Sequence, residues 1–289
     1  MTTVTERARE LSHADIEKVL ATIDIPACPA IVTEVMQEAQ CDNPNLNRLA
    51  RRVAADPSML ATALKLANSP MFCRGEPLTD VREALMRIGM RNVVCVVIAV
   101  ALRSTMTGVP PAFIEAFWSR NARLAQATGS AARRAFGMSP DAAYTYALFH
   151  NAAVPLMVRR YPEYRGILEE CSREGQMLAE REEAYFPCTH AVVGSLIVRN
   201  WGLPSLVGKA IRLHHDPELY DLPDETLPGG ARSLIAITHI AEHLLSEIEG
   251  STDIEVGDGC FERALAHFGF DLQDVDALRI LVQESAGAS

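Results

Sequence analysis

Apolar residues recur every three or four positions along almost the whole of this sequence. Ile31, Val35 and Met36 show the spacing, which places apolar side chains on one face of a helix. The sequence also contains helix start signals. Asp56–Pro57 and Ser139–Asp141 each place a capping side chain directly before a proline. No segment alternates apolar and polar residues as a half-buried strand does. The sequence therefore predicts an all-α fold.

Glycine, proline and helix-capping residues divide the periodic segments into separate helices. Thr79 is expected to cap a helix that Gly89 ends, and Gly108–Pro111 is expected to separate two lobes. Pro155 should end or kink the helix that passes through His150. The predicted helices cover residues 29–40, 45–55, 57–68, 80–88, 90–107, 112–136, 140–154, 161–173, 176–184, 188–200, 204–214, 229–249, 259–268 and 271–284. No fixed repeat runs through them, which argues against a solenoid.

Membrane and secreted classes find little support. The longest apolar run, Val93–Leu102, is about half as long as a membrane-spanning helix, so we expect a buried core helix there. Met1–Glu10 is polar and lacks the pattern of a leader peptide. The seven cysteines are odd in number and include no C-x-x-C pair. We therefore expect a reduced, cytoplasmic protein with no membrane contact.

The net charge of −10 is concentrated toward the C-terminus. Residues 215–289 contain sixteen Asp and Glu, three arginines and no lysine. Because DNA phosphates are contacted by Lys and Arg, this region argues against direct binding of nucleic acid. The pairs Arg51–Arg52, Arg133–Arg134 and Arg159–Arg160 are expected on solvated faces. The acidic region is either a solubilising surface or a docking surface for a basic partner.

Histidines are the natural candidates for chemistry. His150, His190 and the pair His214–His215 belong to three separate predicted helices or helix ends. If these helices converge, their imidazoles can bind a metal ion; taken singly, each is an ordinary core or surface residue.

A second histidine pattern lies on one predicted helix. His239, Glu242 and His243 match the H-x-x-E-H pattern of inverted zinc peptidases. A peptidase also needs a third ligand and a substrate cleft, for which the sequence has no signal. The sequence contains neither a G-x-S-x-G nucleophile turn nor a phosphate-binding glycine loop. Peptidase, serine hydrolase and nucleotide-binding functions are therefore not supported.

Several segments in consistent order resemble the HDOD domain, a helical module related to the HD-type metal phosphohydrolases. Those in the N-terminal half are Ile25–Val32, Leu49–Pro57, Leu64–Ser69 and Ala84–Arg91. Those in the C-terminal half are Trp118, the segment around His150, Thr189–Gly194, Asn200–Pro204 and Ala210–His215. The resemblance covers about residues 20–245.

The resemblance implies an N-terminal helical lobe packed on an HD-like helical core. We accordingly expect an N-terminal extension over residues 1–20 and an HDOD domain over 21–245. Its two lobes would cover 21–110 and 111–245, and an acidic helical extension would follow over 246–289. The resemblance also implies a bacterial source and a signalling or regulatory role.

The resemblance further implies which residues occupy the metal-ligand positions of an HD hydrolase. Arg120 falls near the position of the first histidine, His150–Asn151 replaces the His-Asp pair, and Glu242 falls near the late aspartate. Arginine is cationic and asparagine is neutral, so both changes oppose a divalent cation. We expect no functional di-metal centre, no catalytic residue and no cofactor.

Two binding hypotheses stay open in this vestigial site. His190, His214 and His215 are retained, so one Zn²⁺ or Ni²⁺ held by His150, His190 and either His214 or His215 is not excluded. The Arg120 guanidinium is also suited to contact a phosphate or carboxylate anion in the vestigial cavity.

The function expected from the resemblance is a non-catalytic signal-transduction module. About 20 residues precede the resemblance and about 45 follow it, so we expect this chain to act in trans on other signalling proteins. The alternative is a residual HD-type phosphohydrolase acting on a nucleotide or phosphate ester. A transcriptional regulator that touches DNA directly is a third hypothesis, which the acidic charge opposes. The apolar helices leave room for a homodimer.

Overall fold

The computed structural model describes residues 12–41, 44–73 and 75–287, and within these ranges the chain is helical with no strand. The all-α prediction is therefore confirmed. Residues 1–11 of the predicted N-terminal extension lie outside the described residues. The helices are α1 (His13–Thr22), α2 (Ala30–Gln40), α3 (Leu46–Ala54), α4 (Pro57–Ala67), α5 (Val81–Thr105), α6 (Pro111–Ala131), α7 (Pro140–Phe149), α8 (Val154–Arg160), α9 (Tyr164–Glu174), α10 (Leu178–Tyr185), α11 (His190–Asn200), α12 (Ser205–Leu213), α13 (Gly229–Glu249), α14 (Cys260–Phe268) and α15 (Leu272–Gly287).

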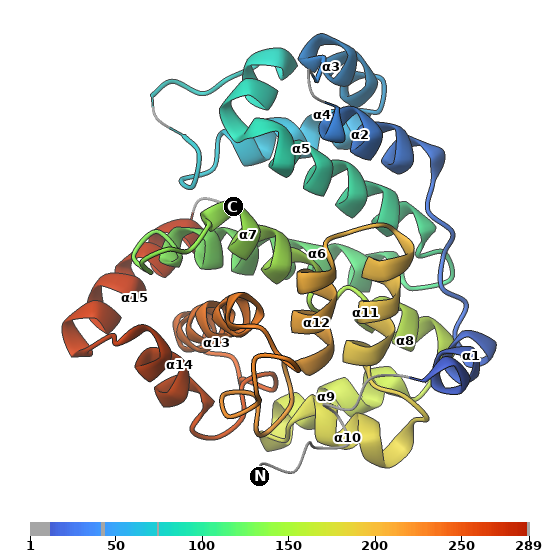
Figure 1. Cartoon of the computed structure of the whole chain (residues 1–289), viewed down its shortest axis with the longest axis vertical. Helices are drawn as coiled ribbons and strands as arrows, with labels where there is room; N and C mark the ends of the chain where they lie inside the picture. Colours follow the sequence, from blue (N-terminus) through green and yellow to red (C-terminus); the bar gives the residue numbers. More distant parts are fainter. Residues whose placement is uncertain (1–11, 42–43, 74, 288–289) are drawn as a thin grey trace.

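Helix α5 is the spine of the N-terminal lobe, and α2, α3 and α4 pack against it (Figure 1). Val93, Val97 and Leu102 on α5 are fully buried, which confirms the predicted core helix. Among the described helices, α5 alone has the length and apolar composition to cross a bilayer, but 61% of its most apolar window is buried inside the protein. That burial is typical of a core helix.

Helix α13 is the centre of the HD-like core. It contacts α6, α7, α12, α14 and α15, and these helices surround it in Figure 1. Thirteen of its 21 residues are buried, including Leu234, Ile237 and Leu244. A helix buried on most of its circumference fixes the positions of all the helix ends around it, which is what holds the site described below.

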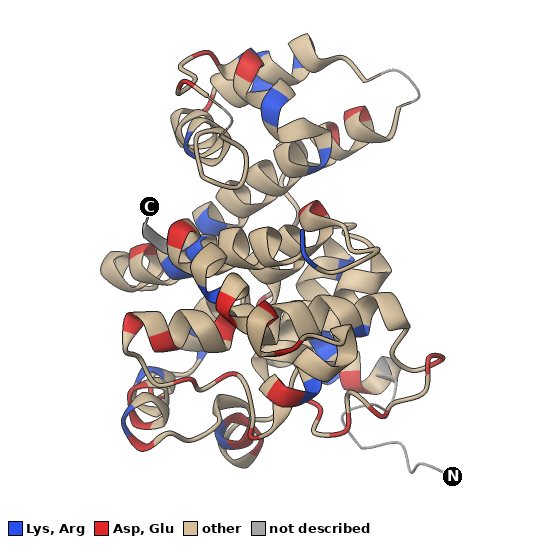
Figure 2. Ribbon diagram, turned by 90° about the vertical axis from the view of Figure 1, so that its left-hand side faces the viewer, with Lys and Arg blue, Asp and Glu red and all other residues tan. Residues whose placement is uncertain are grey.

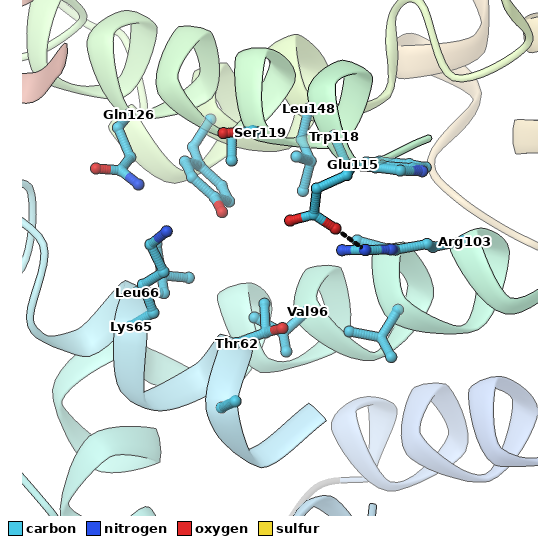
Figure 3. A pocket seen from close by; sticks show the side chains of 15 residues that line it. Thr62, Lys65, Leu66, Val96, Arg103, Glu115, Trp118, Ser119, Gln126 and Leu148 are labelled. Atoms are coloured by element: carbon cyan, nitrogen blue, oxygen red, sulfur yellow. Dashed lines mark hydrogen bonds and ion pairs between the residues drawn. The ribbon is translucent and has the colours of Figure 1, made fainter. Parts of the chain in front are cut away.

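Polar contacts and a hollow mark the junction between the lobes. The buried Asn92 amide on α5 donates to Asp141 Oδ1 at the start of α7 (2.9 Å), and Trp201 Nε1 donates to the Pro26 carbonyl oxygen (2.9 Å). Figure 3 shows the hollow between α4, α5, α6 and α7, across which Arg103 and Glu115 form an ion pair. The predicted N-terminal helical lobe packed on an HD-like core is confirmed.

Local details differ from the expectations at two helix ends. Asp80, and not Thr79, caps α5, because its carboxylate accepts a hydrogen bond from the Glu83 backbone N–H (3.0 Å). The helix expected to pass through His150 ends at Phe149, with His150 as its C-cap. Pro155 then lies in the first turn of α8, where a missing N–H breaks no helical hydrogen bond.

The predicted helix break at Gly89 is present as a kink inside α5. Gly89 has φ 77° and ψ 161°, which is a region that only glycine adopts without strain. The kink lets the start of α5 cover α4 while its apolar second half runs toward the core.

Candidate functional site

The structure brings the four candidate histidines together at the ends of three helices. His150 caps the C-terminus of α7, His190 is the first residue of α11, and His214–His215 follow α12. The His190 ring centroid lies 5.3 Å from that of His214 and 5.0 Å from that of His215, and His150 lies 5.4 Å from His214. His150, His190 and His214 are buried. The predicted helix ends therefore converge on one buried imidazole cluster.

A buried carboxylate orients His190. Glu182 on α10 accepts a hydrogen bond from His190 Nδ1 through Oε2 (2.7 Å) and two more from the His190 backbone N–H (3.1 Å each). Tyr164 donates its hydroxyl to the other oxygen, Oε1. The backbone N–H is one of the unpaired donors at the start of α11, so the carboxylate anchors the helix and the imidazole together.

His150 and His214 each form a hydrogen bond with the backbone at the end of their own helix. Each donates Nδ1–H back to the carbonyl oxygen three residues earlier, His150 to Ala147 (2.8 Å) and His214 to Ile211 (2.6 Å). Helix C-termini leave such carbonyl groups unpaired, so a histidine at the last turn satisfies one of them. This hydrogen bond fixes the ring and leaves Nε2 facing the interior of the cluster.

An acid from the loop after α13 completes the cluster. Glu255 is buried, and its Oε2 lies 3.1 Å from His215 Nε2. This contact has the distance of an ion pair, and among the residues that the structure describes Oε2 has no partner with hydrogen-bond geometry. One ligand atom each from His190, His214, His215 and Glu255 lies within 4.8 Å of all the others.

Burial and mutual proximity shift the pKa values in this cluster in different directions. Burial lowers the pKa of His150 to about 4 and that of His214 well below its usual range. Burial also opposes a charged His190, but the Glu182 carboxylate outweighs burial and raises the pKa of His190. Burial acts to raise the pKa of Glu255, but the surrounding imidazoles, His215 first among them, hold it well below its usual range.

Arg120 and Glu242 form a buried ion pair beside the histidines. Arg120 Nη2 on α6 lies 2.5 Å from Glu242 Oε1 on α13, and Arg120 Nε lies 3.6 Å from Glu249 Oε2. The Glu242 side chain is only 2% exposed. Burial raises the pKa of Glu242 to about 7, although Arg120 opposes that rise. The arginine thus places a positive charge at the position that the resemblance assigns to a metal ligand.

A hollow lies next to this ion pair, lined among others by Arg120, Asn121, Asn151, Glu242 and Glu255. Asn151 Oδ1 and Asn121 Nδ2 are buried and have no hydrogen-bond partner in the described part of the chain. The anion contact hypothesised for Arg120 stays a prediction, and two of the carboxylates that surround the guanidinium, Glu242 and Glu255, line the same hollow.

The H-x-x-E-H string does not gather its histidines on one point. His239 Nδ1 lies 3.2 Å from the Tyr220 hydroxyl, whereas the His243 ring stacks on Phe261 at 4.1 Å between centroids. Glu242, between them, pairs with Arg120. Neither histidine belongs to the group of close ligand atoms found among the described residues.

Two carboxylates of the site were not among the sequence candidates. Glu182 precedes His190 by eight residues and follows no recognised spacing, and Glu255 is one of many acids in the C-terminal region. The general excess of acid over base in residues 215–289 was the only signal for Glu255, and it indicated a surface charge rather than a buried group.

Comparisons with known proteins show which family and which relatives this chain resembles. The HDOD domain family model matches residues 25–217. An uncharacterized protein of Treponema pallidum is 25% identical over 268 residues, which are 90% of this chain and 48% of that protein, so the chain spans about half the length of this relative.

Solved structures share the fold at low sequence identity. An HDOD domain protein of Geobacter sulfurreducens superimposes with a TM-score of 0.67 at 19% identity, covering 94% of this chain and 97% of that one. A protein of Shewanella amazonensis named as a candidate phosphohydrolase gives 0.68 at 20%, covering 96% and 98%. A protein of Marinobacter aquaeolei named as a candidate signal transduction protein gives 0.69 at 19%, covering 99% and 66%. The family match over most of the chain settles its membership: the chain belongs to the HDOD domain family.

Proposed function

We propose that this chain is a non-catalytic regulatory module that acts on other proteins through direct contacts. The observation that carries the proposal is the buried ion pair between Arg120 and Glu242, next to Asn151. In the HD hydrolases that the fold resembles, this region would supply metal ligands and a carboxylate that assists the attacking water. Here it supplies an internal cation and a neutral amide.

The residues in this half of the site do not fit a di-metal centre. A guanidinium cannot ligate, and Arg120 already neutralises Glu242, the anion that a metal would require. Asn151 removes a further negative charge. Two charge changes of this kind cost several kcal/mol of cation binding, on the order of 1000-fold in affinity at an effective dielectric near 20. Without a metal in this half of the site, Arg120 and Asn151 supply no group that activates water for phosphoester attack.

Hydrolysis assays test the absence of catalysis. Metal-free protein would be supplied in turn with Mg²⁺, Mn²⁺, Fe²⁺ and Zn²⁺ and mixed with p-nitrophenyl phosphate, its diester and a panel of nucleotides. We expect turnover no higher than in blanks that lack protein. Metal-dependent turnover that disappears in His150→Ala would reject the proposal and establish the alternative, a residual phosphohydrolase.

A repair variant makes the same test sharper. Arg120→His combined with Asn151→Asp returns the imidazole and the carboxylate to this half of the site. We expect the double variant to bind at least one more Mn²⁺ per chain than the wild type, whereas Arg120→Met, which removes the guanidinium without supplying a ligand, should not. Equal metal content in all three proteins would show that these two positions do not decide binding.

The proposed partner is a protein with a basic surface. The chain that follows α12 is rich in acidic residues, and Figure 2 marks the positions of Asp and Glu along the ribbon in red. Exposed acids in this region are Asp221, Asp224, Glu225, Glu247, Glu249, Asp258, Glu262, Asp271, Asp276 and Glu284. Charges of this density attract a basic partner over about 8 Å at physiological salt, and added salt screens them.

Crosslinking in living cells can test this surface. Asp271→Asn with Asp276→Asn removes two negative charges near the start of α15 without touching the site, and Glu76→Gln with Glu83→Gln is a matched change on the N-terminal lobe. We expect a crosslinked protein that the first pair loses and the second pair keeps, and we expect high salt to dissociate the same complex when it has not been crosslinked. Equal crosslinking by both pairs would reject the acidic surface as the contact.

A further inference from the structure

The buried histidine cluster is the part of the site that the proposed function leaves unused. We propose that His190, His214, His215 and Glu255 bind one transition-metal ion of the Zn²⁺ class, with Glu182 orienting His190 from behind. The fourth ligand lies outside the segment that matches the family model, residues 25–217. The inference goes beyond the proposed function and does not depend on it.

Hydrogen bonding supplies the first argument. Glu182 can only accept from His190 Nδ1, and the Ile211 carbonyl can only accept from His214 Nδ1, so both Nδ1 atoms carry protons. When both rings are neutral, the two Nε2 atoms point lone pairs at each other across 3.4 Å. A cation between them satisfies both lone pairs.

Distance supplies the second argument. Zn–N bonds of about 2.0–2.1 Å place tetrahedral ligands about 3.3–3.4 Å apart. His190 Nε2 lies 3.4 Å from His214 Nε2 and 3.2 Å from His215 Nε2. Glu255 Oε2 lies 3.1 Å from His215 Nε2, which is close to the same ligand separation. The four ligand atoms lie within 4.8 Å of one another, so the widest pair must close by up to about 1.4 Å when the ion binds.

The donor set argues for the class of ion. Three imidazoles and one carboxylate suit Zn²⁺ and its neighbours, and they do not suit Mg²⁺ or Ca²⁺, which prefer oxygen ligands. The hydrogen bond from His190 to Glu182 is the carboxylate–histidine arrangement that supports metal-bound histidines. Four protein ligands fill a tetrahedral ion and leave no position for a reacting water, so the site is structural or regulatory rather than catalytic.

The position of Glu255 connects the bound ion to the loop between α13 and α14. Glu255 belongs to the loop between α13 and α14, and the neighbouring Ile254 carbonyl accepts a hydrogen bond from Leu178 N (3.0 Å) at the start of α10. An ion on this site therefore ties the ends of α11 and α12 to the segment that leads into the acidic C-terminal helices. Metal occupancy is expected to reduce hydrogen exchange across residues 250–259.

Direct metal analysis of the full chain tests the site. Tag-free protein, stripped with a chelator and dialysed against Zn²⁺, should retain about one Zn²⁺ per chain by elemental mass spectrometry. Co²⁺ in place of Zn²⁺ should give the intense visible absorption of a four-coordinate ion. Folded wild-type protein that retains no Zn²⁺ at about 100 μM free metal would overturn the proposal, whatever any variant does.

Two matched variants locate the ion. Glu255→Gln keeps the shape of the fourth ligand and removes its charge, and we expect it to weaken Zn²⁺ binding at least about 10-fold. His243→Gln changes a partly exposed histidine outside the cluster, and we expect its affinity to stay within about twofold of the wild type. The opposite order would place the ion elsewhere and overturn the assignment. Metal binding without turnover leaves the proposed function standing, whereas turnover would reject that function and not this site.

Discussion

The ion pair between Arg120 and Glu242 makes a prediction about stability that depends on pH. Arg120→Met removes the guanidinium and keeps most of the side-chain volume, so Glu242, whose side chain is 2% exposed, loses the cation with which it forms an ion pair. With that cation gone, the pKa of Glu242 should rise further above about 7. A carboxyl whose pKa is higher in the folded state than in the unfolded state stabilises the fold below its unfolded pKa, and this contribution is lost as the pH rises through the folded value. The variant should therefore be most destabilised in alkaline solution.

The magnitude follows from the burial of the two partners. Removing one partner of a fully buried ion pair costs about 3–5 kcal/mol. The Arg120 side chain is 31% exposed, so solvent screens part of the pair and we expect a loss of about 2–3 kcal/mol at pH 8. At pH 5.5 Glu242 is protonated in the variant, and the remaining loss is about 1 kcal/mol for the missing hydrogen bond.

Urea unfolding followed by far-ultraviolet circular dichroism at the two pH values measures both losses. The double variant Arg120→Met with Glu242→Gln leaves no charge at either position of this pair, and it should recover to within about 1 kcal/mol of the wild type at pH 8. Equal unfolding free energies for the single and double variants, or a loss in Arg120→Met that is the same at pH 5.5 and pH 8, would refute the reasoning.

Three other perturbations have expected outcomes. Gly89→Ala meets no atom within 4 Å of the added Cβ but forces alanine to φ 77°, so it should lower the free energy of unfolding by about 1–3 kcal/mol; an unchanged urea midpoint would contradict this. Trp201→Phe deletes the hydrogen bond to the Pro26 carbonyl and should cost about 1–2 kcal/mol in the same assay, whereas no loss would mean that this contact contributes nothing. Zn²⁺ at 100 times the wild-type dissociation constant should raise the unfolding free energy of the wild type by about 2.7 kcal/mol, and calorimetry should show a rise of no more than about 1.4 kcal/mol in Glu255→Gln, which binds at least about 10-fold more weakly.

Much of the helical architecture could be predicted because its signals are local. Asp56 before Pro57 and Ser139 before Pro140 cap their helices as expected, and Gly89 breaks α5 where expected. The cap of α5 was predicted at Thr79 and lies at Asp80, because these two adjacent residues are both good caps and only the tertiary course of the chain chooses between them. The boundaries at residues 110 and 245 remain predictions.

The site was only partly predictable, because it is built from tertiary contacts. The histidines stood out by residue type, but their convergence depends on α12, which packs against α7, α11 and α13. Glu182 and Glu255 have no spacing that distinguishes them from surface acids, and only their burial against imidazoles identifies them. The pairing of Arg120 with Glu242 joins residues on α6 and α13 that no local pattern relates.

The position of α13 has a consequence for how this module can be moved between proteins. The family match stops at residue 217, whereas α13 begins at Gly229 and carries thirteen buried residues. A fragment cut at residue 217 would lack the helix that the others pack around, and would expose the apolar faces of α6, α7 and α12 to water. The recognisable segment is therefore shorter than the unit that folds, and any transplant or fusion of this domain has to carry the chain through α15.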